Sequence, residues 1–146
     1  MKDFMAEFGV LASYPANIVL LLARLAVAYG FTMPAMMKIE QIEATQMWFE
    51  SIGIPFASLM APLVSGIELA GIVLLTLGLF TRFISLLLMC VMAGAIAFVH
   101  FQHGFATAQN GFEIPLYYFL FLFIFATFGP GKYSIDCLII KEECHA

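Results

Sequence analysis

The sequence predicts an all-α integral membrane protein, built as a bundle of four helices with a short amphipathic helix between the first two. The chain of 146 residues is 63% hydrophobic and only 11% charged, and its mean hydropathy is +1.00. This composition excludes an ordinary soluble domain. A hydrocarbon core requires roughly 20 apolar residues per helix. Three segments reach about this length, residues 17–37, 55–80 and 83–101, and a fourth, residues 114–129, is shorter. They use nearly the whole chain, so residues 1–146 are predicted to form one transmembrane domain.

A β structure is excluded by the same segments. An open sheet leaves its edge hydrogen bonds unsatisfied in lipid, and the segments lack the polar alternation of a membrane barrel. The amphipathic helix is predicted over residues 39–51, where glutamates alternate with large apolar side chains that include Trp48. Such a segment is typical of a helix lying at the membrane interface, where tryptophan is an anchor.

The positions of lysine and arginine predict the orientation of the chain. Positively charged loops resist translocation across the membrane. The side that holds both termini contains Lys2, Arg82, Lys132 and Lys141, whereas the first and third connections contain only Lys38. We therefore expect both termini in the cytoplasm. The chain has a net charge of −4 and no cluster of basic residues in its sequence. Both features argue against nucleic acid as a partner.

Two charged residues inside the apolar segments form the first candidate site. Glu68 lies about midway along the second segment, and Arg24 lies within the first. A charge at the centre of a membrane helix costs about 2.5–3.5 kcal/mol on insertion scales, so such residues usually face the bundle interior and have a partner. Ala61, Ser65 and Gly71 share the face of Glu68 at helical spacing. We expect Arg24 to pair with Glu68; the alternative is that Arg24 reaches the cytoplasmic surface while Glu68 stays protonated.

A second polar cluster is predicted near the outer surface, where Lys38, His100, Glu113 and Tyr117 meet. We expect a hydrogen bond between His100 and Glu113 with Lys38 nearby. This cluster either lines a headgroup or quinone pocket or only ties the loops together. His100, His103 and Glu113 could together offer two nitrogens and one oxygen to a metal. Loop and capping roles account better for these two histidines, so no metal site is predicted.

The sequence contains no motif for a covalent cofactor. A dinucleotide fingerprint, a haem-attachment motif and a CxxC pair are all missing, so any electron chemistry would need a borrowed cofactor. Cys90 is expected to be a small packing residue. Cys137 and Cys144 are expected to be reduced thiols in the cytoplasm.

Several short motifs follow one another in a characteristic order: Gly53–Pro55, Glu68–Gly71, Leu75–Arg82, Gly111–Leu116 and Gly129–Asp136. In this order they resemble the DoxX family of small bacterial membrane proteins, over about residues 18–136. The last motif is the most specific. The chain departs from the family's usual pattern at residues 32–37, which lack a glycine-rich approach to Lys38, and at Ala70, where a second glycine is usual.

The resemblance implies a four-helix protein of the bacterial inner membrane that is associated with redox partners. One branch of the family is similar to a subunit of thiosulfate:quinone oxidoreductase, and other members are linked to thiol or oxidative-stress systems. This implies an accessory subunit that binds a quinone or a partner subunit in the lipid bilayer, with turnover only as part of a membrane oxidoreductase. Two alternatives stay open: a small-molecule or ion carrier, which lacks the support of an inverted repeat, and a non-catalytic membrane scaffold. A homo-oligomer also remains open.

Overall fold

A computed structural model describes residues 2–139 as a set of helices, with no strand among these residues. The longer helices are α1 (Lys2–Glu40), α3 (Ala57–Leu77), α4 (Thr81–Ala95) and α5 (Glu113–Phe128). Helix α1 packs on α3, α3 on α4, α4 on α5, and α5 on α1. The predicted all-helical fold is confirmed, and each of the four predicted apolar segments forms a helix.

In the part of the chain that the structure describes, three helices are long and apolar enough to cross a membrane, over Pro15–Glu40, Ala57–Leu77 and Thr81–His103. The third of these continues α4 through a π-helical turn, η1 (Ile96–His100), and a 3-10 turn, η2 (Phe101–His103). Helix α5 is equally apolar but has 16 residues. Many large apolar side chains on the outward faces of these helices are exposed, which suits lipid better than water.

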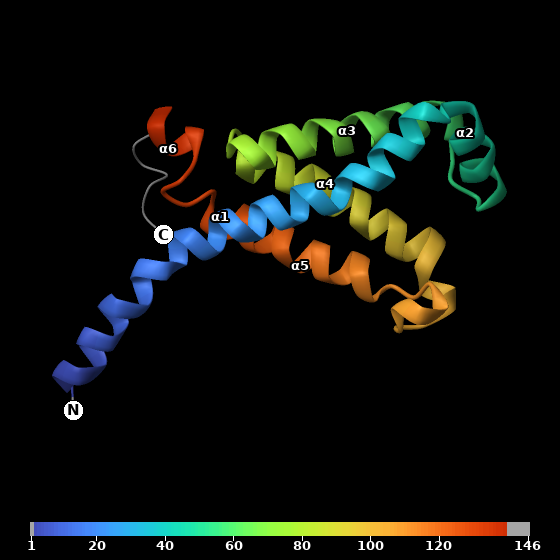
Figure 1. Ribbon diagram of the computed structural model, residues 1–146. Coiled ribbons are helices and arrows are strands. Elements are labelled where there is room, and N and C mark those ends of the chain that lie inside the picture. The colour runs from blue at the N-terminus through green and yellow to red at the C-terminus, as the bar shows by residue number, and fades with distance from the viewer. Residues whose placement is uncertain (1, 140–146) are drawn as a thin grey trace.

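The two ends of the molecule are built differently (Figure 1). One end carries α2 (Ile42–Ser51) and the loop that follows η2, which includes a short 3-10 turn, η3 (Thr107–Gln109). The other end carries the α3–α4 turn and the closing segment, residues 129–136, which leads into α6 (Ile135–Ile139). The first turns of α1 extend beyond the other helices (Figure 1). Helix α2 confirms the predicted short helix between the first two long ones, and it begins at Ile42 because α1 continues to Glu40.

The main apolar core lies where α1, α3, α4 and α5 meet. Its buried side chains include Phe31 from α1, Leu75 from α3, Leu88 from α4 and Phe125 from α5. At the contact of α3 with α4, a Cβ added to Gly71 would lie 2.7 Å from a methyl carbon of Leu88. Any larger residue here would displace the side chain of Leu88, so glycine suits this close approach, as is common between helices in lipid.

Candidate functional site

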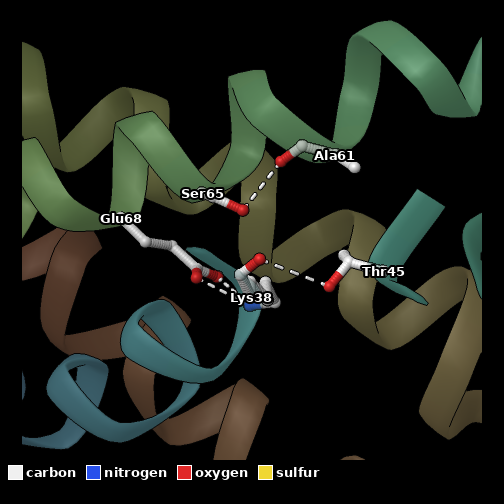
Figure 2. A network of polar contacts seen from close by, with 5 residues as sticks. All are labelled: Lys38, Thr45, Ala61, Ser65 and Glu68. Carbon is white, nitrogen blue, oxygen red and sulfur yellow. Dashed lines mark hydrogen bonds and ion pairs between the residues drawn. The ribbon is translucent and has the colours of Figure 1, made fainter. Parts of the chain in front are cut away.

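The carboxylate in the middle of α3 is paired with a lysine from the last turn of α1. Lys38 Nζ lies 2.6 Å from each carboxylate oxygen of Glu68 (Figure 2). The side chain of Lys38 is 20% exposed and Glu68 is 1% exposed. A buried carboxylate requires a compensating charge and hydrogen bonds. Lys38 supplies both.

The neighbouring hydroxyl groups do not compete for this ion pair. Ser65 donates to the carbonyl oxygen of Ala61 at 2.7 Å, one turn earlier in α3. Thr45 of α2 donates to the carbonyl oxygens of Gln41 at 3.0 Å and Lys38 at 3.5 Å (Figure 2). Both hydroxyls therefore satisfy backbone groups, and the lysine is the partner of the carboxylate.

The predicted pairing of Arg24 with Glu68 is wrong. Arg24 has no exposed surface, and it donates from Nη1 to the carbonyl oxygen of Pro130 at 2.8 Å and from Nη2 to that of Tyr133 at 2.7 Å. Its guanidinium lies level with Gly78, where an added Cβ would be 2.9 Å from Arg24 Cζ. Gly78 is ten residues beyond Glu68 in the sequence, or about 15 Å along a helix. That offset prevents the pairing, and the complete burial also excludes the alternative in which Arg24 reaches the surface.

A second set of polar contacts, which sequence reasoning missed, holds the closing segment in place. The carboxylate of Asp136 accepts hydrogen bonds from the backbone N–H groups of Phe80 at 2.8 Å and Thr81 at 3.0 Å. It thereby caps the start of α4. The side chain of Asn17 accepts a hydrogen bond from the backbone N–H of Lys132 at 2.9 Å. With the two bonds from Arg24, these contacts fasten the closing segment to α1 and to the α3–α4 turn.

The signal that could have revealed this network is the specific motif of the closing segment. Its polar and glycine residues follow an apolar helix directly, and their backbone groups need partners when they are buried. Arg24 is the long donor that provides two of them. Arg24 therefore has a structural role in holding the closing segment, and it lies away from the Lys38–Glu68 pair.

The Lys38–Glu68 pair lies on the wall of a cavity of about 460 Å³. Residues from α1, α2, α3, α4, η1 and α5 line it, and the lining is mostly apolar. Trp48 and Phe49 of α2 belong to this wall, as do Cys90 of α4 and the π-helical turn. Cavities of roughly 300–1,000 Å³ with few polar groups are typical of small-molecule sites, and π-helical turns are frequent at functional sites.

The predicted outer cluster is only partly assembled. Lys38 and His100 both line the cavity. His100 Nδ1 lies 2.8 Å from the carbonyl oxygen of Asn110. A carbonyl oxygen accepts, so Nδ1 carries the hydrogen, and in the neutral ring Nε2 is then free to accept one.

Glu113 and Tyr117 do not line this cavity, and the predicted hydrogen bond between His100 and Glu113 is not formed. Glu113 instead accepts hydrogen bonds from the N–H of Thr107 at 3.1 Å, from its hydroxyl at 2.7 Å, and from Tyr117 at 3.2 Å. Glu113 precedes the apolar stretch of α5, and the hydrogen bonds from Thr107 lower the pKa of its carboxyl group. Its contacts are those of a loop-fastening residue.

The possible metal ligands are not brought together either. His103 Nδ1 lies 3.0 Å from the carbonyl oxygen of Val99. Among residues 15–139, whose side chains the structure describes, no group of three or more His, Cys, Asp or Glu side chains could hold a metal ion, so His100, His103 and Glu113 do not form the set that the sequence allowed. Cys90 is a free thiol on the cavity wall. Cys137 is disulfide-bonded, contrary to the predicted free thiol, and Cys144 lies outside the described residues.

Comparisons with known proteins identify similar chains but no described activity. The DoxX family model matches residues 19–101. An uncharacterized protein of Haemophilus influenzae is 36% identical over 104 residues, which are 66% of this chain and 69% of that protein. A second uncharacterized protein of the same organism is 38% identical over 84 residues, which are 55% and 63% of the respective chains. No solved structure matches the chain.

Proposed function

Because this chain belongs to the DoxX family, we propose that it binds a quinone beside Lys38 and Glu68, as an accessory subunit of a redox system in the bacterial inner membrane. The observation that carries the proposal is the ion pair on the wall of a cavity that is otherwise mostly apolar. Ligand pockets typically combine an apolar lining with a few polar groups that fix the ligand's orientation. A quinone has the matching chemistry, an apolar body with two carbonyl oxygens.

The polar groups of the cavity suit both redox forms of such a ligand. A lysine ammonium has three N–H donors, and two oxygens of Glu68 take up two of them. The third can donate to a quinone carbonyl. His100 lines the same cavity with Nδ1 at the carbonyl of Asn110, so its Nε2 can accept a hydrogen bond from a quinol hydroxyl.

The helices support the placement of this site in a membrane. We assign α5 as a fourth span, because its 16 residues reach about 24 Å and it packs between α4 and α1. We assign the end with the closing segment to the cytoplasm on the distribution of positive charge, which makes the disulfide of Cys137 in α6 an unusual one, since disulfides are rare in that compartment. Arg82 and Lys132 lie at that end, whereas the charge of Lys38 near the other end is compensated by Glu68, which agrees with the rule that positive residues stay inside.

The test is the lipid-soluble content of protein purified in a mild detergent, measured by mass spectrometry of organic extracts. Gly94 provides the variant that closes the cavity, since it lines the wall and an added Cβ meets nothing within 4 Å. Gly66 is the matched control, because a Cβ there is also unopposed but lies outside the cavity. We expect stoichiometric quinone with the wild type and Gly66→Leu, and its loss from Gly94→Leu. Protein without quinone, or equal retention by both variants, would overturn the proposal and favour a scaffold or carrier.

A further inference from the structure

We infer that the charge-balanced Lys38–Glu68 pair makes the cavity selective for uncharged amphiphiles, and that removing the charge of Glu68 converts it into a site for anionic amphiphiles. This rests on the proposed function, because it specifies the class of ligand that the same cavity accepts. It assigns a specificity role to two residues whose ion pair could otherwise be only a structural link between helices.

The first argument is the electrostatic balance of the wall. Both oxygens of Glu68 are within 2.6 Å of Lys38 Nζ, so the pair as a whole is neutral. Among the residues that line the cavity, no lysine, arginine, aspartate or glutamate other than Lys38 and Glu68 is present. A ligand carboxylate or ammonium would therefore bring an uncompensated charge into apolar surroundings, which is costly.

The second argument is that a neutral polar headgroup needs no rearrangement of the pair. The third N–H of Lys38 can donate to a carbonyl or hydroxyl oxygen while the other two remain on Glu68. The side chain of Lys38 is 20% exposed, against 2% for that of Glu68, so the lysine is the accessible partner. Apolar side chains such as Phe31, Met60 and Phe98 on the same wall can contact the rest of the ligand.

The same geometry predicts what Glu68→Gln would do. Glutamine keeps the shape of glutamate but removes its charge, which leaves the ammonium of Lys38 without a counterion on the cavity wall. An anionic headgroup can then take the place of the lost carboxylate. In the double variant Lys38→Gln/Glu68→Gln the wall is neutral again, so the preference for uncharged ligands should return.

The chain contains a built-in reporter for this experiment. Trp48 is its single tryptophan and lies on the cavity wall, so a bromine atom that contacts it will quench its fluorescence. Three bromoalkyl probes of equal chain length would be used, ending in an alcohol, a carboxylate or an amine. Each is titrated into detergent-purified wild type, the two Glu68 variants, Gly94→Leu and Gly66→Leu. Quenching that Gly94→Leu abolishes and Gly66→Leu retains is assigned to the cavity.

We expect the alcohol probe to bind the wild-type cavity at least about tenfold more tightly than either charged probe. Glu68→Gln should bind the carboxylate most tightly, and the double variant should again prefer the alcohol. Equal binding of all three probes by the wild type would overturn the inference, as would an unchanged order in a folded Glu68→Gln. If Glu68→Gln does not fold, the binding preferences of the wild type and the double variant still test the inference. A preference of either protein for a charged probe would contradict it.

The outcomes separate this inference from the proposed function. An alcohol preference in protein that yields no quinone would refute the quinone and retain the selectivity. Quinone in the extract together with equal binding of the three probes would support the quinone proposal and refute the selectivity. No quenching assigned to the cavity by any probe would overturn the selectivity and also count against the cavity as a ligand site.

Discussion

Lys38 Nζ lies 2.6 Å from both carboxylate oxygens of Glu68, so one ion pair joins the last turn of α1 to the middle of α3. The two residues are 30 positions apart in the sequence, and the chain between them includes all of α2. The ion pair therefore fixes the end of α1 against α3, the two helices that α2 connects, and Trp48 and Phe49 of α2 line the same cavity.

The stability of the ion pair can be tested by a double-mutant cycle. Glu68→Gln should lower the free energy of unfolding by about 2–4 kcal/mol, because it leaves a partly buried ammonium unpaired. Adding Lys38→Gln should then cost little more, since the unpaired charge is removed. Unfolding in detergent, monitored by circular dichroism, measures both values. The combination of Arg24→Gln with Glu68→Gln is the control and should be additive within about 0.5 kcal/mol; additivity of the Lys38 and Glu68 changes would contradict the pairing.

Arg24 should be important for stability through the closing segment. Arg24→Met removes the hydrogen bonds to the carbonyl oxygens of Pro130 and Tyr133. Loss of two charge-assisted bonds to the backbone should lower the free energy of unfolding by about 2–4 kcal/mol. Lys132→Met is the control, because only the backbone N–H of this exposed residue makes the contact with Asn17. Equal thermal unfolding of the two variants would show that Arg24 does not hold the segment.

Asp136 should contribute to stability as the cap of α4. Asp136→Ala removes both acceptors for the N–H groups of Phe80 and Thr81, and loss of a cap costs about 0.5–2 kcal/mol. Asp136→Asn keeps one side-chain oxygen and should lose only part of this. Melting temperatures should therefore fall in the order wild type, asparagine, alanine. An asparagine variant as unstable as the alanine variant would mean that the carboxylate charge matters rather than its capping geometry.

Gly78 should tolerate alanine poorly because of its neighbours as well as its backbone. Its φ is +67°, and an added Cβ would lie 2.6 Å from Cβ of Ser134 and would also collide with the guanidinium of Arg24. Gly53 has a φ of +81° but nothing within 4 Å, so Gly53→Ala measures the backbone cost alone, about 1 kcal/mol or slightly more. Gly78→Ala should be destabilised by at least about 1 kcal/mol beyond that. Similar unfolding free energies would rule out the close approach.

The assigned orientation can be tested by cysteine labelling in intact cells. In a background without the three native cysteines, Ser51→Cys and Ala106→Cys should react with a membrane-impermeant maleimide. Lys132→Cys should react only after lysis, because the assigned topology places the closing segment in the cytoplasm. The reverse pattern would invert the topology.

The positions of the helices could be predicted from the sequence alone. An apolar segment in lipid must satisfy its backbone hydrogen bonds internally, so length and hydropathy define a helix with little dependence on its neighbours. The burial of Glu68 was likewise predictable, because Ala61, Ser65 and Gly71 share its face and are buried with it. The match over residues 19–101 confirms the family that the sequence motifs indicated.

Only the tertiary structure decided which charged residue is the partner of Glu68. Both Arg24 and Lys38 precede it on α1, and the choice depends on how far α1 is shifted along α3, which no spacing in the sequence records. The contacts place Lys38 beside Glu68 and Arg24 beside Gly78, about 15 Å apart along α3. Glu113 illustrates the same limit, because the turns of the preceding loop bring Thr107 to it in place of His100. Composition determines which segments enter the membrane, whereas contacts between distant side chains require the relative positions of helices that only packing fixes.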